Sequence, residues 1–331
     1  MASIKEVAEA AGVSTATVSR VFSNKPHVRA VVRERVMAAV DQLAYRPNRT
    51  ARTLRSQKSN TIGLIVSDIR NPFFTAISRS VEDTAYEHGY SVLLCNTDED
   101  PAKEELYLKL MQDENVAGII FSPTRQIITH FADMELEFPT VLVDRSLKNG
   151  DVDAVLLDNV TAAYDLTRHL LDQGYRRIGL LLGAVGTTGQ ERQRRYEEAL
   201  RECGSVPSAE LIRDIQPKVE TGRAATLELL ALAQPPDAML ATNNLLTAGA
   251  LQAIRERGLR IPHDLALAGF DETIWATLVE PAVTVMAQPT DDIGRTATDL
   301  LLQRISEPNR PPRRVILQGQ LHVRGSSARR S

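Results

Sequence analysis

The feature that most constrains the fold is a regular alternation of apolar runs and amphipathic stretches that begins at Asn60. In the first series, helical patterns near 73–88 and 102–113 separate apolar runs at 61–69, 90–96, 116–121 and 140–143. In the second, helical patterns near 160–173, 190–202, 219–232 and 244–257 accompany apolar runs at 177–182, 211–215, 238–241 and 265–270. Near-continuous apolar strands separated by helices are typical of parallel sheets covered on both faces. The sequence therefore predicts an α/β body of two doubly wound parallel-sheet lobes.

Length and composition narrow the class of protein. A chain of 331 residues is too long to form a single compact core. Its composition, with 43% hydrophobic and 24% charged residues, is ordinary for a globular protein. No apolar run approaches the roughly 20 residues of a membrane span, and the first residues lack the apolar stretch of a secretory signal. Cys95 and Cys203 are the only cysteines, which excludes a disulfide framework or a cysteine zinc cluster. We expect a cytoplasmic protein.

Charge is distributed unevenly along the chain. Residues 1–60 hold three Lys and eight Arg against four acidic residues, a charge of +7, although the whole chain carries −3. The remaining residues therefore sum to −10. A small basic module on a large acidic body is typical of a phosphate-binding head joined to a domain that does not bind nucleic acid. The alternative is a basic tail that is merely solvated.

The basic segment has the pattern of a helix-turn-helix. Ser3 and Glu6 form a capping box at the start of a helix whose apolar face ends at Ala11, and Gly12 suits the turn after it. Ser14 can cap a second helix, near 14–22, and a third, near 30–44, completes a small core. The second helix would expose Thr15, Ala16, Ser19 and Arg20, side chains short enough for it to enter a major groove. Arg20 can contact either a guanine edge or a phosphate.

Three segments carry a resemblance to a known family. They are residues 4–8 (IKEVA) with 11–14 (AGVS), residues 16–21 (ATVSRV), and residues 45–48 (YRPN) followed by 51–55 (ARTLR). The first two resemble the DNA-binding headpiece of the lactose-repressor (LacI/GalR) family, and the third resembles its hinge helix. The match extends over essentially the whole chain. Two departures concern headpiece stability: Arg29 and Val32 stand where the family usually has Ser and Thr, and Ala44 replaces the usual glycine.

The resemblance implies a sequence-specific transcriptional regulator that binds pseudo-palindromic operator DNA as a homodimer. A hinge helix near 48–56 is too short to be stable alone and should form only beside its dimer mate on DNA. Leu54 would wedge into the minor groove, unless it is an ordinary linker leucine. The implied DNA-contacting residues are Ser14, Thr15, Ala16, Thr17, Ser19, Arg20, Asn24, Asn48, Arg49, Arg52, Leu54 and Arg55.

The resemblance also implies a periplasmic-binding-protein-like body whose chain crosses between the lobes near Asn159, Gln288 and His322. The predicted domains are a headpiece at 1–46, a hinge at 47–59 and an effector-binding and dimerisation domain at 60–331. Within that domain we expect lobe one at 60–159 and 289–321, and lobe two at 160–288 and 322–331. First-lobe surfaces near 73–88 and 96–115 should form the dimer and shift when an effector binds.

Polar and aromatic residues follow the predicted strands, where ligands bind in open α/β sheets. Their positions match the effector contacts of the family: Ser67, Phe73, Phe74, Asp144, Arg145, Thr188, Arg192, Asn243, Asp271, Trp275 and Gln288. Asp271, Arg192, Asn243 and Gln288 can hydrogen-bond vicinal hydroxyls, and an aromatic ring can stack on a sugar face.

Several of these residues have structural alternatives. Arg192 and Asp271 can form an ion pair across the cleft, Asp144 and Arg145 can pair with each other, and Trp275 can belong to a core. A sugar acid such as gluconate or ketogluconate would find cations in Arg145 and Arg192. Arg195, where the family has glycine, would place a large cation near the start of a second-lobe helix and change the choice of effector.

No motif of an enzyme or cofactor site is present. The sequence lacks a nucleotide-binding glycine fingerprint, a phosphate-binding loop and a nucleophile elbow, and its six histidines show no metal-ligand spacing. We therefore predict no catalytic residues, no metal and no cofactor. We predict a repressor controlled by a small sugar or sugar-acid effector. The alternatives are a sugar receptor without a transcriptional role and a sugar-modifying α/β enzyme.

Overall fold

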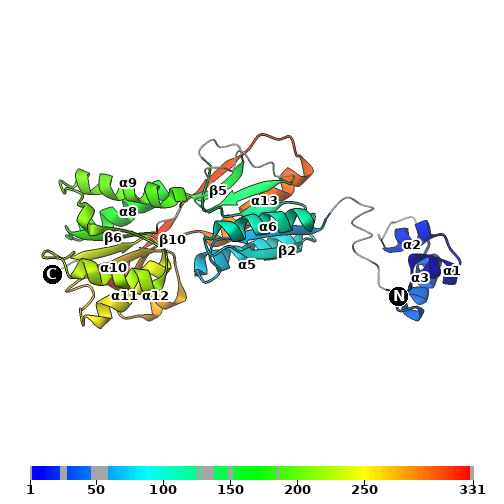
Figure 1. Cartoon of the computed structure of the whole chain (residues 1–331), viewed down its shortest axis with the longest axis horizontal. Coiled ribbons are helices and arrows are strands. Elements are labelled where there is room, and N and C mark those ends of the chain that lie inside the picture. The colour runs from blue at the N-terminus through cyan, green and yellow to red at the C-terminus, as the bar shows by residue number, and fades with distance from the viewer. Residues whose placement is uncertain are drawn as a thin grey trace. The chain divides into compact units, whose positions relative to one another are not determined.

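The structure is a computed structural model that describes residues 2–22, 28–45, 59–124, 127, 138–147, 152–183 and 186–328. The chain divides into two compact units, Met1–Ser59 and Asn60–Ser331. Figure 1 shows the elements of each. None of the helices in the described parts of the chain combines the length and apolarity that crossing a bilayer requires.

The first unit contains the predicted three helices, α1 (Ile4–Ala10), α2 (Thr15–Phe22) and α3 (Ala30–Gln42). The capping box is formed: the Glu6 amide donates to Ser3 Oγ at 3.4 Å, and the Ser3 amide donates to Glu6 Oε2 at 2.7 Å. Gly12 adopts a φ of +61°, as the turn requires. The helices share a core whose buried members are Val7, Ala8, Ala11, Val18, Val21, Val36 and Ala39. The predicted helix-turn-helix is confirmed.

Both ends of helix α3 carry a residue that is unfavourable at its capping position. Arg29 occupies its N-cap without a side-chain hydrogen bond to the helix. At the other end the Tyr45 amide donates to the Val40 carbonyl and the Ala44 amide to the Asp41 carbonyl, the pattern of a Schellman motif. That motif places Ala44 at a φ of +45°, where a Cβ is unfavourable and glycine is normally found.

Ala44→Gly is therefore expected to stabilise the headpiece by about 1 kcal/mol, because it removes the left-handed strain of an L-residue. Thermal unfolding of residues 1–59, followed by circular dichroism, measures the change. Ala39→Gly is the opposing control: Ala39 lies buried inside the same helix, so glycine there should destabilise it. A lower melting temperature for Ala44→Gly would contradict the assignment of strain to this position.

The second unit contains two six-stranded sheets. The first has the order β11-β5-β4-β3-β1-β2 and consists of β1 (Thr61–Val66), β2 (Ser91–Asn96), β3 (Ile119–Phe121), β4 (Thr140–Val143), β5 (Asp153–Leu157) and β11 (Arg314–Leu317). The second has the order β12-β10-β9-β8-β6-β7 and consists of β6 (Ile178–Gly183), β7 (Ile212–Ile215), β8 (Ala238–Ala241), β9 (Ala266–Phe270), β10 (Thr284–Ala287) and β12 (Gln320–His322). Among the strands that the structure describes, every pairing is parallel except that of β10 with β12. The predicted fold class of two doubly wound lobes is confirmed.

Helices cover both faces of each sheet (Figure 1). In the first lobe, α5 (Pro72–Glu87) and α13 (Thr290–Ser306) pack on one face and α6 (Pro101–Asp113) on the other. In the second, α8 (Asn159–Asp172) and α9 (Gly186–Glu202) share one core, while α10 (Val219–Leu230), α11 (Asn244–Glu256) and the short α12 (Ile274–Leu278) share the other. Short 3-10 turns occupy Ala209–Leu211 and Gly325–Ser327.

Helix α9 begins at Gly186, four residues before its predicted start at 190. Two glycines in its first turn have low helix propensity, which is why the pattern predicts a later start. A Cβ at Gly189 would lie 2.9 Å from the carbonyl oxygen of Gly183. This close packing on the end of β6 stabilises a helix start that propensity alone disfavours.

The chain crosses between the lobes three times, after β5, after β10 and between β11 and β12. Strand β12 already pairs within the second sheet at Gln320, two residues before the expected boundary at 322. Only Gln318 and Gly319 separate β11 in the first sheet from β12 in the second. Strand β12 pairs with β10 in antiparallel orientation.

Candidate functional site

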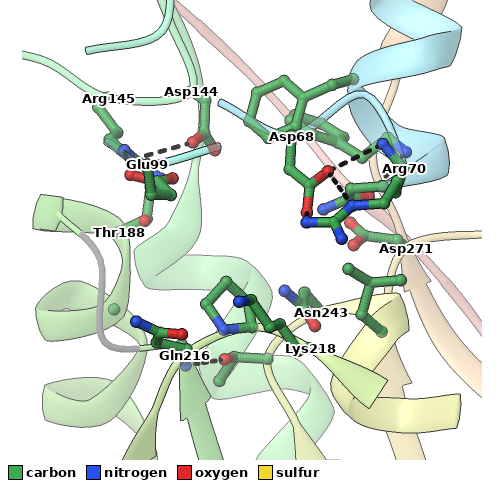
Figure 2. A pocket seen from close by; sticks show the side chains of 18 of the residues that line it. Asp68, Arg70, Glu99, Asp144, Arg145, Thr188, Gln216, Lys218, Asn243 and Asp271 are labelled. Atoms are coloured by element: carbon green, nitrogen blue, oxygen red, sulfur yellow. Dashed lines mark hydrogen bonds and ion pairs between the residues drawn. The ribbon is translucent and has the colours of Figure 1, made fainter. Parts of the chain in front are cut away.

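A cavity of about 620 Å³ lies between the two lobes, lined by residues that follow the carboxyl ends of strands in both sheets. Asp68 follows β1, Glu99 follows β2, Asp144 follows β4, Asn243 follows β8 and Asp271 follows β9. This is the position where open parallel sheets bind ligands. Figure 2 shows polar side chains from both lobes facing this space.

Nine of the predicted effector residues line the cavity: Phe73, Phe74, Asp144, Arg145, Thr188, Arg192, Asn243, Asp271 and Gln288. Residues that the prediction missed also line it, among them Asp68, Arg70, Glu99, Gln216 and Lys218. Contact of any of these residues with an effector stays a prediction.

Two predicted residues do not line the cavity as the structure describes it. Ser67 is fully buried, and its Oγ lies 3.1 Å from the Oγ of Ser122 within the first lobe. Trp275, on α12, packs against the second-lobe core, which is the structural alternative considered for it. Placing these two residues in the cleft was wrong.

Arg195 also lies away from the cavity. Its guanidinium pairs with Glu198 at 2.5 Å and lies 5.6 Å from the centroid of the Tyr164 ring. These partners hold the Arg195 guanidinium outside the cavity lining. An effect of Arg195 on the choice of effector stays a prediction.

Arg145 belongs to a buried cluster of charges. Its guanidinium donates to both carboxylate oxygens of Glu99, at 3.0 and 2.5 Å, and to the Pro123 carbonyl at 2.6 Å. Asp144 lies 3.3 Å from its Nε. Burial opposes the charge of Arg145, but the two carboxylates outweigh it and raise the pKa of the guanidinium. This cation is therefore neutralised by the protein itself.

Arg192 has a different environment. Its Nε donates to Asn159 Oδ1 at 2.8 Å, an η-nitrogen donates to the Thr242 carbonyl at 2.5 Å, and its Cζ lies 3.9 Å from the centroid of the Phe270 ring. It forms no ion pair with any carboxylate in the described ranges, so the predicted alternative of an ion pair with Asp271 is not found. Burial lowers the pKa of Arg192, although Asp271 and Asp144 oppose this from a distance. Arg192 is thus a buried cation held by neutral partners.

Asp271 is fixed by hydrogen bonds on both carboxylate oxygens. Oδ1 accepts from Gln288 Nε2 at 2.6 Å, and Oδ2 accepts from the backbone amide and the side chain of Asn244, each at 3.1 Å. Burial raises the pKa of Asp271, while Arg192 and these donors act against it. For Asp144 too, burial raises the pKa, with Arg145 opposing.

Backbone geometry explains part of the arrangement. Glu99, Asp144 and Asp271 have φ values of +61°, +67° and +73°, a region that non-glycine residues rarely adopt. Such strain is concentrated at functional sites, where the surroundings hold it in place.

The N-termini of two helices also face the cavity lining. Asn71 caps α5 through the Phe73 amide at 2.9 Å, and Asn243 caps α11 through the Leu246 amide at 2.8 Å. Helix N-termini carry partial positive charge and favour electronegative groups.

Of the four residues predicted to be exposed on α2, Ala16 and Arg20 are exposed, whereas Thr15 and Ser19 are half-buried. Ser14 is also exposed, Thr17 is half-buried, and Val18 and Val21 face the core. Ser14 Oγ accepts from the Thr17 amide at 3.2 Å, so this hydroxyl caps the helix. The other predicted DNA contacts lie outside the described residues: Asn24, Asn48, Arg49, Arg52, Leu54 and Arg55.

Within the described ranges, no three His, Cys, Asp or Glu side chains are grouped so that they could hold a metal ion. The cavity instead presents the guanidiniums of Arg70, Arg145 and Arg192, several carboxylates and the amides of Asn243 and Gln288. These groups can donate to and accept from a small polar molecule with many oxygen atoms.

Comparison with known proteins gives consistent matches at the level of family, sequence and structure. Residues 3–48 match the model "Bacterial regulatory proteins, lacI family", and residues 167–327 match "Periplasmic binding protein-like domain". The HTH-type transcriptional regulator PtxS of Pseudomonas aeruginosa is 37% identical over 328 residues, covering 98% of this chain and 95% of that protein.

Two solved structures extend this similarity. The lac repressor dimer bound to operator and the anti-inducer ONPF matches with a TM-score of 0.85 at 27% identity, covering 99% of both chains. The complex of the transcriptional regulator CelR with cellobiose matches with a TM-score of 0.75 at 30% identity, covering 98% of this chain and 100% of CelR.

Proposed function

We propose a function from one premise: the chain belongs to the lacI family of bacterial regulatory proteins. It is a sequence-specific DNA-binding regulator, a repressor, that works as a homodimer in the cytoplasm beside the chromosomal DNA. A small sugar or sugar acid in the cavity between the lobes controls its affinity for the operator. The observation that carries this proposal is the cavity itself, where hydrogen-bonding groups converge from the carboxyl ends of both sheets.

The charges in the cavity favour an effector that carries a carboxylate. Arg145 already has Glu99 and Asp144 as partners, whereas Arg192 is buried with neutral partners only. A buried charge without a counter-ion is unfavourable, and a bound carboxylate would supply one in bidentate geometry. The hydroxyls of the same ligand would contact Asp271, Asn243 and Gln288.

A dimer surface is available on the first lobe, where the resemblance placed it. Tyr86 on α5, Leu94 on β2 and Leu106 on α6 are 76%, 44% and 61% exposed. Strand β2 is the edge of its sheet. Large apolar side chains beside a sheet edge are typical of a surface that another chain covers.

DNA binding provides the test of the proposed function. Operator fragments are selected from a random library with the purified full chain, and affinity is measured from 50 to 200 mM salt. Because phosphate contacts release counter-ions, log affinity should fall linearly with log salt, and Arg20→Ala should weaken binding to the selected fragment by about tenfold. Isothermal titration with gluconate, 2-ketogluconate, ribose and fructose then identifies an effector.

Deletion of residues 1–59 is the matched control, because Asn60–Ser331 is a compact unit of its own. This variant should lose operator binding and retain effector binding. Operator affinity that survives the deletion, or that does not change with salt, would exclude the headpiece as the DNA-binding module.

A further inference from the structure

A buried hydrogen bond joins the two lobes beside the cavity. The side-chain nitrogen of Asn244 donates to Asn71 Oδ1 at 2.7 Å. Asn71 is the N-cap of α5 in the first lobe, and Asn244 is the first residue of α11 in the second. The two side chains are only 7% and 2% exposed, so water does not compete for this bond in the arrangement that the structure describes.

Both asparagines also bind groups within their own lobes. Asn71 Oδ1 accepts from the Phe73 amide at 2.9 Å, which caps α5. The Asn244 side chain donates to Asp271 Oδ2 at 3.1 Å, and its backbone amide donates to the same oxygen. A continuous chain of hydrogen bonds therefore runs from the cavity carboxylate of Asp271, through Asn244 and Asn71, to the first turn of α5.

We propose that Asn244 and Asn71 form an interlobe latch, with Asn244 as a positioning residue between Asp271 and the first lobe. The latch exists only while the lobes are together, and when they separate both groups bind water. Removing one partner leaves the other buried with one hydrogen-bonding position unfilled, although its bond within its own lobe remains. This disfavours the closed arrangement, in which the two lobes are together. A ligand between the lobes binds the closed arrangement. The apparent affinity of the protein for that ligand therefore falls when a smaller fraction of molecules is closed. This last step rests on the proposed effector function, whereas the latch itself does not.

Two substitutions separate the latch from helix capping. Asn71→Ser retains a good N-cap for α5 but is too short to reach the second lobe. Asn244→Ala removes the donor from the other side and leaves the Asn71 cap on Phe73 intact. Asp100→Ser is the control, because Asp100 caps α6 through the Ala102 amide at 2.9 Å within the first lobe and does not line the cavity.

Hydrogen–deuterium exchange of the full chain without any ligand tests the latch directly. Each latch variant should accelerate exchange severalfold in the facing segments of both lobes, residues 71–77 and 243–249, because separation exposes both. The double variant should be no faster than the faster single variant, since one bond is lost only once. Asp100→Ser should change exchange around 100–106 alone. The proposal is overturned if each variant changes exchange only in its own lobe.

The effector arm uses the ligand from the panel that binds the wild-type chain. Asn71→Ser and Asn244→Ala should each weaken its binding by about tenfold, and the double variant by about tenfold rather than about a hundredfold. Wild-type affinity in both single variants would overturn the coupling of the latch to the cavity. If the wild type binds no member of the panel, the effector function fails, while the exchange experiment still decides the latch.

Discussion

Arg192→Met should weaken effector binding by about a hundredfold or more, because two charge-assisted hydrogen bonds to a ligand are each worth about 1.5–3 kcal/mol. The guanidinium lies buried at the cavity, its place set by Asn159, Thr242 and the Phe270 ring. Titration calorimetry with a matched pair, gluconate and glucose, measures the effect. The loss should be larger for gluconate, since only that ligand supplies a counter-charge.

The same substitution should leave the protein folded and lower its melting temperature only slightly. It removes the donor to Asn159 and to the Thr242 carbonyl, but it also removes a buried charge whose pKa burial already lowers. Arg195→Met is the matched control on the same helix, because Arg195 pairs with Glu198 outside the cavity lining. Its effector affinity should equal that of the wild type. Wild-type affinity of Arg192→Met for gluconate would exclude Arg192 as the carboxylate partner.

Asp153→Asn is expected to reduce the free energy of unfolding by about 3–5 kcal/mol, the usual cost of removing one partner from a buried ion pair. The Asp153 side chain is fully buried, lies 3.0 Å from nitrogens of both Arg304 and Arg310, and accepts from the Arg313 amide at 2.7 Å. It thereby joins β5 to α13 and to the segment that leads into β11. Urea unfolding at pH 7, followed by circular dichroism, measures the loss.

The pH dependence of this contribution has a definite sign. Burial would raise the pKa of Asp153, but hydrogen bonds from Arg304, Arg313 and Arg310 outweigh it, and the pKa is lowered. A carboxyl with a lowered pKa in the folded state stabilises the protein above its unfolded pKa of about 3.9, and the contribution is lost as pH falls through the folded pKa. The difference between wild type and Asp153→Asn should therefore shrink below about pH 4.

The control for this prediction is Asp264→Asn, which removes a carboxylate whose partner Arg260 is 74% exposed. Solvent screens that pair, so the unfolding midpoint should hardly change. If both substitutions reduced the free energy of unfolding by a similar amount, burial would not be the reason that the Asp153 ion pairs stabilise the protein.

Periodicity predicts the two lobes and most of the elements in residues 60–270, and the rule that ligands bind at strand ends predicts most of the cavity. The strand-end rule does not predict which of two successive residues points into the cavity. Ser67 and Asp68 both follow β1, but successive side chains of an extended chain point to opposite sides. Ser67 therefore contacts Ser122 while Asp68 lines the cavity. On α12, Ile274 and Leu278 are 82% and 77% exposed, and Trp275 faces the core instead.

Other cavity residues depend on tertiary structure that no local pattern records. Glu99 reaches Arg145, 46 residues away, from a backbone turn with two successive positive φ values, at Asp98 and Glu99. The Asp and Pro residues around Glu99 indicate a turn, but a positive φ is unusual for Glu, so the sequence does not indicate that Glu99 turns toward Arg145. The bond between Asn71 and Asn244 joins residues 173 apart, and each looks in sequence like an ordinary helix cap.

The sheet order also has a consequence for how this chain folds as the ribosome makes it. Strand β5 pairs with β4 on one side and β11 on the other, and the first-lobe core includes Ile293, Ala297 and Leu301 of α13. Both elements emerge only after β6 to β10 of the second lobe have been synthesised. Until then, β5 is an edge strand, and the face of the first sheet that carries α5 lacks α13. The first lobe therefore begins before the second lobe but is completed after nearly all of it. While the second lobe is being synthesised, the nascent chain exposes the unpaired edge of β5 and the apolar surface that α13 later covers.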